Sequence, residues 1–204
     1  MKVAVVGHVE WADFVTLARV PLQGEIVHVR QAWQVAAGGW IHAKALLAQH
    51  LVARSWAGAR EGEPARRPWP GADLRPIARM TVRDRGVELY VLDQASARAL
   101  AFGPGLVGGS AVPGSWGNTV IVAHRDTHFA FLKKVALDDE IEIEGARAAP
   151  ARYRVRELGI VDQSESRLLD ATDTSQLTLI TCYPFDAVRP GTRLRYVVIA
   201  DRIA

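Results

Sequence analysis

Cysteine is almost absent from this sequence, because Cys182 is the only one among 204 residues. A single cysteine excludes an internal disulfide, so disulfide chemistry says nothing about the redox compartment. The thiol is left with two roles, either a small buried hydrophobe or a reactive nucleophile. The sequence around it must decide between them.

Long apolar runs are also absent. No run approaches the ~18 apolar residues that span a bilayer, and Gly7, His8 and Glu10 interrupt the apolar start of the chain. We therefore expect neither a signal peptide nor a membrane anchor in this sequence.

The chain as a whole has no strong excess of positive or negative charge. The formal net charge is +3, from 25 Lys and Arg against 22 Asp and Glu spread along the chain. A nucleic-acid-binding domain more often gathers its positive charge on one face, so no nucleic acid is expected as a partner. The acidic stretch with Glu140, Glu142 and Glu144 alternates like a solvated strand face, and we expect no metal or cofactor there.

The patterns that are present predict a β-rich fold with a sizeable core. The hydrophobic fraction is 49%, and short alternating segments such as "VELYVL" and "EIEIEG" are typical of half-buried strands. Many short strands with few helices predict a closed barrel or a sandwich. Strands are expected near 78–83, 87–92, 118–124, 140–145, 151–161, 177–182 and 194–201, with one short helix within 126–135.

The first third of the chain has a different organisation. Residues 1–37 show a strand, a turn and a strand, "KVAVVG" and "EIVHVRQAWQV", which we expect to pair as a hairpin, to dock on the barrel or to stay loosely ordered. Residues 40–60 have a helical pattern. Residues 61–76 contain four prolines and two glycines, which predicts a linker.

Three chemically active residue types stand at predicted strand ends. His124 ends the run "NTVIVAH", Cys182 ends "LTLITC", and Arg195 opens the last strand. In a hairpin the end of one strand lies beside the start of the next, so Cys182 and Arg195 can share a rim. If the strand of His124 runs parallel to that of Cys182, its end reaches the same rim.

Such a trio suits acyl transfer. A thiolate attacks a carbonyl carbon, and a neighbouring cation favours the thiolate over the thiol. His124 can protonate the leaving amine as a general acid. The fixed donors of Arg195 can stabilise the oxyanion that forms as the carbonyl becomes tetrahedral.

Plainer interpretations exist for each residue. A lone cysteine after an apolar strand is usually a buried hydrophobe, and a lone histidine or arginine is usually structural or superficial. His124, His128 and Cys182 also offer donors that zinc accepts. Because His124 ends a strand, however, the two histidines are expected to diverge.

Larger motifs carry a resemblance to a known family. "TLITC" (178–182), a strand-ending histidine upstream and an arginine opening the next strand resemble the sortases, whose motif is Thr-Leu-x-Thr-Cys. "WPGADLRPIARM" and "ASARALAFGPGLVGGSAVPGSWGNTVIVAHRDTHFAFL" resemble the proteobacterial sortases of the marine, single-target type, and "GWIHAKALLAQHL" resembles their juxtamembrane helix. The resemblance covers about 38–204.

This resemblance implies a fold and an activity. It implies an all-β fold, a closed eight-stranded barrel with an N-terminal helix, and cleavage of a C-terminal sorting signal similar to Leu-Pro-x-Thr-Gly. Cys182 falls on the family's nucleophile, His124 on its histidine and Arg195 on its arginine, with Arg193 and Arg189 as nearby alternatives. The implied partners are a substrate protein carrying the sorting signal and an amine that resolves the thioacyl-enzyme.

The front of the chain departs from that family. Residues 1–37 resemble the opening of a ribokinase-like (PfkB-type) sugar kinase, but the Gly-x-Gly-Asp motif of that family is missing, so kinase activity is not expected. The resemblance implies a sortase that is anchored in the inner membrane and faces the periplasm, but no anchor is expected in this sequence. The alternative to an active transpeptidase is therefore a catalytically idle barrel that only binds peptide. The expected organisation is a kinase-like fragment (1–37), a helix with a Pro-rich linker (38–70) and a catalytic barrel (71–204).

Overall fold

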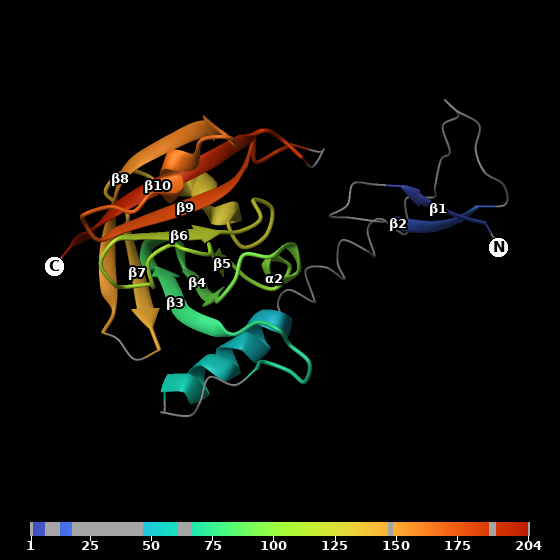
Figure 1. Cartoon of the computed structure of the whole chain (residues 1–204), viewed down its shortest axis with the longest axis horizontal. Helices are drawn as coiled ribbons and strands as arrows, with labels where there is room; N and C mark the ends of the chain where they lie inside the picture. The colour runs from blue at the N-terminus through green and yellow to red at the C-terminus, as the bar shows by residue number, and fades with distance from the viewer. Residues whose placement is uncertain are drawn as a thin grey trace. The chain divides into compact units, whose positions relative to one another are not determined.

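The chain divides into two compact units, Met1–Ile41 and His42–Ala204. The computed structural model (Figure 1) describes residues 2–6, 13–17, 47–60, 67–146, 149–187 and 191–203. In the first unit β1 (Lys2–Val6) pairs antiparallel with β2 (Asp13–Leu17). The sequence analysis missed β2, and its second expected strand, residues 25–35, lies outside the described residues.

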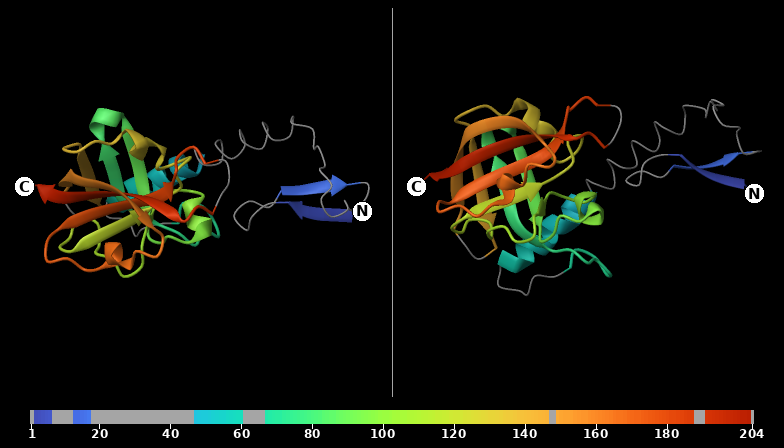
Figure 2. Two further views of the ribbon diagram at one scale, coloured as in Figure 1. Left: turned by 90° about the horizontal axis from the view of Figure 1, so that it is seen from above. Right: turned by 45° about the horizontal axis from the view of Figure 1, so that its top comes forward.

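Within the described part of the second unit, eight strands close into a barrel in the order β10–β8–β7–β3–β4–β5–β6–β9. This confirms the predicted closed eight-stranded barrel. In the right-hand view of Figure 2 the last strands, orange to red, lie side by side. The bounds are β3 Pro76–Val82, β4 Val87–Leu92, β5 Gly105–Leu106, β6 Asn118–Val122, β7 Glu140–Gly145, β8 Ala151–Asp162, β9 Gln176–Tyr183 and β10 Leu194–Ile203.

Helical elements are few among the described residues. A helix spans 47–60, and four short elements follow it: η1 (Arg83–Arg85), α2 (Ala97–Leu100), η2 (Ala130–Lys134) and η3 (Ser166–Leu169). The helix confirms part of the pattern predicted over 40–60, and η2 is the short helix expected within 126–135. No described helix combines the length and apolar character needed to cross a bilayer.

Alternation along the strands builds the core. In β3, "PIARMTV", every second residue is buried, so Ala78, Met80 and Val82 point inward. Tyr153 of β8 and Phe129, which precedes η2, are fully buried in the same cluster. This period of two is the signal that made the strands predictable.

The shortest strand, β5, gave no such signal. It has two residues and pairs parallel with β4 and antiparallel with β6. A side chain at Gly105 would collide with the carbonyl oxygen of Gln94, so only glycine fits this close approach. A strand of two residues is too short for an alternation pattern, and for this reason sequence reasoning missed it.

The helix 47–60 belongs to the barrel unit. Val52 packs with Leu74, Leu92 and Ala99 in a second apolar cluster. Gln49 fastens the helix to the chain, because its amide donates to Phe102 O at 2.6 Å and accepts from the backbone N–H of Tyr90 at 3.2 Å. The helix therefore covers an outer face of the barrel on the side of β4.

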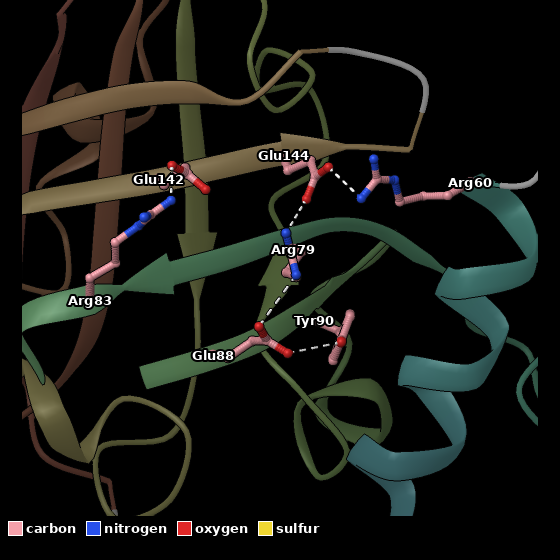
Figure 3. Close-up of polar contacts among 7 residues, drawn as sticks. All are labelled: Arg60, Arg79, Arg83, Glu88, Tyr90, Glu142 and Glu144. Carbon is pink, nitrogen blue, oxygen red and sulfur yellow. Dashed lines mark hydrogen bonds and ion pairs between the residues drawn. The ribbon is translucent and has the colours of Figure 1, made fainter. Parts of the chain in front are cut away.

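An ion-pair network continues this docking face on β3, β4 and β7 (Figure 3). Glu144, only 4% exposed, accepts from Arg79 Nη2 at 2.6 Å and pairs with Arg60 Nη1 of the helix at 2.8 Å. Arg79 also pairs with Glu88 at 3.4 Å. The expectation of a solvated acidic face is thus wrong at Glu144, because the helix buries this end of the strand.

Candidate active site

Three neighbouring strands carry the residues that the sequence singled out. β6 runs parallel to β9, and β9 runs antiparallel to β10. The apolar, β-branched runs "NTVIV" and "QLTLITCY" make these strands the buried centre of the sheet. Their order brings the end of β6, the end of β9 and the start of β10 to one rim of the barrel.

The register places Arg195 directly across from Cys182. The two residues are Cα partners in the ladder between β9 and β10. Directly opposed residues in an antiparallel pair have Cβ atoms about 4.5–5.5 Å apart and share a face of the sheet. Cys182 is a free, half-buried thiol, so the two residues are neighbours at the rim.

His124 lies level with Cys182 on the other side. The last parallel pair is Val122 with Ile180, and contacts continue beyond it. The N–H of Ala123 donates to Ile180 O at 3.3 Å, and Thr181 Oγ1 donates to Ala123 O at 2.8 Å. One residue further along both strands come His124 and Cys182.

Alternation assigns Cys182 and Arg195 to the outside of the barrel. Leu179 of β9 and Val198 of β10 oppose each other inside the core. Cys182 is an odd number of residues from Leu179, and Arg195 is an odd number from Val198, so both lie on the outer face. His124 follows Ala123, which belongs to the core, so alternation continues to the same outer face.

Arg195 is held by uncharged acceptors. Its Nη1 donates to Thr192 O at 2.6 Å and to Leu194 O at 2.9 Å, and its Nη2 donates to Gln163 Oε1 at 3.1 Å. None of these three partners carries a charge. The positive charge of Arg195 is therefore available to an anionic group at the rim.

The neighbouring Arg193 is engaged elsewhere. Its Nε donates to Asp162 Oδ2 at 3.3 Å. Hydrogen bonds from Ser164, and then the bond from Arg193, lower the pKa of Asp162 to about 2. Arg189 lies outside the described residues. Of the two described arginines, Arg195 is the one placed opposite the thiol.

The second histidine of the motif is buried and neutral. His128 is 8% exposed, and its burial, together with the charge of nearby His124, lowers its pKa to about 4. Its Nδ1 lies 3.4 Å from Thr127 Oγ1. Among the described residues, which include His124, His128 and Cys182, no three Cys, His, Asp or Glu side chains gather to hold a metal ion. The zinc alternative finds no support in this geometry.

A buried polar ladder lies on the same outer face, and sequence reasoning missed it. Thr178 Oγ1 donates to Asn118 Oδ1 at 2.8 Å, and the Asn118 amide donates to the carbonyls of Leu168 and Asp170 at 2.9 and 3.2 Å. These bonds fasten the connection between β8 and β9 to the sheet. The available signal was a pair of polar residues, Asn118 and Thr178, at outward positions of otherwise apolar strands.

Aromatic rings close the barrel interior near the same rim. Tyr183 and Tyr196 stack with centroids 6.2 Å apart, and Phe185 meets Tyr196 edge-on at 5.2 Å. Phe185 and Tyr196 pack against the main core. The site rim thus rests on a filled interior, which favours a fixed geometry for Cys182.

A closed barrel of mixed parallel and antiparallel strands, with its single cysteine at a strand end, defines the class of sortase-type barrels. A family model described as the sortase domain matches residues 80–203, which is more than half of the chain. The chain belongs to the sortase family, whose members are cysteine transpeptidases.

Solved structures of sortases are similar to this chain. A sortase D5 transpeptidase of Clostridium perfringens is 25% identical with a TM-score of 0.56, and the match covers 63% of this chain and 79% of that one. Sortase A of Corynebacterium diphtheriae is 23% identical with a TM-score of 0.58, covering 85% and 96%. Sortase A of Listeria monocytogenes is 23% identical with a TM-score of 0.57, covering 63% and 88%. A search of curated proteins returned no match.

Proposed function

We propose that this chain is a cysteine transpeptidase that cleaves a C-terminal sorting signal similar to Leu-Pro-x-Thr-Gly and transfers the acyl part to an amine. The observation that carries the proposal is the register at the rim, which sets Arg195 opposite Cys182 and His124 level with it. A reactive thiol needs this kind of electropositive, partly exposed surrounding.

The proposed reaction has two acyl-transfer steps. The Cys182 thiolate attacks the carbonyl carbon of the signal's threonine, and the tetrahedral oxyanion receives hydrogen bonds from Arg195. The C–N bond breaks as His124 donates a proton to the leaving amine, which leaves a thioester on Cys182. An incoming amine then attacks the thioester and loses a proton to His124. The thiolate leaves, and a new amide bond has formed.

The proposed partners follow from this reaction. One is a protein that ends in a sorting signal, and the other is a primary amine. The narrower assignment to the marine, single-target type rests on the motifs from "WPGADLRPIARM" onward and remains a prediction. The kinase-like origin of residues 1–37 also remains a prediction.

The test combines a panel of Leu-Pro-x-Thr-Gly-like peptides with hydroxylamine and follows the products by mass spectrometry. We expect cleavage after threonine, with the threonine hydroxamate as the transfer product. Cys182→Ala should abolish both products while the melting temperature stays close to that of the wild type, since the thiol lies at the rim and outside the core. Peptide binding without turnover in the wild type would favour the idle, binding-only barrel instead.

A further inference from the structure

Arg125 occupies a position that the sequence analysis did not consider. It follows His124 directly and is half-buried. Its Nη1 donates to Thr192 Oγ1 at 3.2 Å, and its Nη2 donates to Ala187 O at 3.0 Å. One guanidinium therefore joins the end of β6 to two points of the segment that leads from β9 to β10.

The segment that Arg125 holds leads from the strand of Cys182 to the strand of Arg195. Residues 184–193 connect the end of β9 to the start of β10. Thr192 stands three residues before Arg195, and its carbonyl accepts from Arg195 Nη1 at 2.6 Å. Thr192 is therefore held by Arg125 through its hydroxyl and by Arg195 through its carbonyl.

The chemistry of this clamp suits arginine and no other residue. The planar guanidinium presents several N–H donors in a fixed fork, so it can hold two acceptors at once. A lysine keeps the charge but offers a single flexible donor centre. Replacing Arg125 therefore frees Ala187 or Thr192, or both, without removing any group from the reacting atoms.

We propose that Arg125 is a positioning residue that aligns Arg195 with Cys182 by clamping the β9–β10 connection at Ala187 and Thr192. This inference rests on the proposed function, because it assigns to Arg125 the geometry of that reaction. A displacement of about 1 Å in a catalytic group can cost about 10²-fold in rate. Arg125→Ala should therefore lower kcat by about 10- to 100-fold, with KM changed by no more than about twofold.

A merely stabilising role for Arg125 makes a different prediction. If Arg125 acts through Arg195, its loss matters only while Arg195 is present. Residues that share one network are non-additive, whereas independent residues add. In an Arg195→Ala background, Arg125→Ala should therefore cause less than about threefold further loss. An equal fold-loss in both backgrounds would overturn the positioning role.

The experiment measures kcat and KM for peptide cleavage with hydroxylamine as acceptor, in wild type, Arg125→Ala, Arg125→Lys, Arg195→Ala and the double variant. Arg83→Ala is the matched control, because Arg83 of η1 is an exposed arginine paired with Glu142 of β7 and should keep wild-type kinetics. Thr192→Val removes the hydroxyl acceptor and keeps the carbonyl, so it should lose part of the Arg125 effect and add little to Arg125→Ala.

The outcomes separate this inference from the proposed function. An Arg125→Ala variant with the kcat of an active wild type overturns the inference alone. A wild-type rate for Thr192→Val overturns the route through Thr192 even if Arg125→Ala does not fold. A wild type that forms no acyl product overturns the proposed function, and the inference falls with it.

Discussion

Two arginine-bearing surfaces of the barrel use their charge in opposite ways. On the helix-covered face, Arg60 and Arg79 both point at Glu144, and Arg79 also reaches Glu88 (Figure 3). At the site rim, Arg195 is held by the carbonyls of Thr192 and Leu194 and the amide of Gln163. The carboxylates of the helix-covered face neutralise its arginines, whereas the neutral acceptors at the rim orient Arg195 without neutralising its charge.

This difference distinguishes a structural arginine from the one proposed to act on the substrate. A guanidinium paired with a buried carboxylate is committed to the folded state, because it balances a charge that has little access to water. A guanidinium oriented by neutral acceptors keeps its charge for a ligand. Substitutions on the two surfaces should therefore affect different measurements, activity on the rim and stability on the helix side.

After Cys182, the largest effect is expected at His124. His124→Ala removes the proposed general acid and should lower kcat/KM by about 10²–10⁴-fold, with little change in melting temperature. His50→Ala, on the exposed side of the helix 47–60, is the matched control and should retain full activity. Equal activity of the two variants in a peptide-cleavage assay would remove His124 from the mechanism.

A smaller effect on rate is expected at Arg195. Arg195→Lys keeps the charge but loses the planar fork, so kcat should fall by about 10²-fold, in the range of a lost oxyanion donor. Arg79→Lys on the helix face should leave kcat unchanged and lower stability by about 1 kcal/mol. If the lysine variant at Arg195 turned over at the wild-type rate, oxyanion stabilisation would have to come from backbone donors or Arg193.

The helix face should respond through stability instead. Glu144→Ala leaves Arg60 and Arg79 without their shared buried carboxylate, and because both guanidiniums stay partly exposed to water it should cost about 2 kcal/mol in the free energy of unfolding. Urea denaturation measures this loss, and kcat per folded molecule should stay at the wild-type value. A drop in kcat with unchanged stability would mean that the two surfaces are coupled.

A further effect on stability is a pH dependence from His128. Burial lowers its pKa to about 4 in the folded chain, whereas the unfolded residue titrates near ~6.5. Between these values the unfolded state binds more protons, so stability is complete above pH ~6.5 and falls as the pH drops toward 4. We expect about 3 kcal/mol less stability at pH 4 than at pH 7 from this residue.

The control for this pH dependence is a residue that does not titrate. His128→Gln should show a shallower fall in unfolding free energy over the same pH range than the wild type, when both are measured by urea titration. Identical slopes for the two proteins would show that His128 is protonated in the folded state or that it is exposed.

Local patterns made most of the barrel predictable. The strands β4 and β7 were found at their observed bounds, because alternation and turn residues are local signals. The strand β2, "DFVTL", was missed although its Phe, Val and Thr favour a strand, because residues 8–24 were assigned to a break between the two expected strands. The buried state of Glu144 was also missed, because its partner Arg60 is distant in the sequence.

The candidate residues at the rim could also be found from local patterns in the sequence. His124, Cys182 and Arg195 lie within two residues of a strand end, and the apolar runs beside them are visible in the sequence. The contacts of Arg125 with Ala187 and of Asn118 with Leu168 could not be found in this way, because they depend on how loops return to the sheet. Sequence therefore indicates the groups proposed to react more readily than the residues that hold them.

The most direct test of the account is a crystal structure of the chain with a sorting-signal peptide mimic linked to Cys182. The account predicts the peptide on the outer face of β6 and β9, with its carbonyl oxygen about 3 Å from the Arg195 guanidinium and the His124 ring on the opposite side of the sulfur. A peptide bound elsewhere on the barrel would contradict the account. So would a complex in which another group binds the peptide carbonyl oxygen and Arg195 keeps only its bonds to Thr192, Leu194 and Gln163.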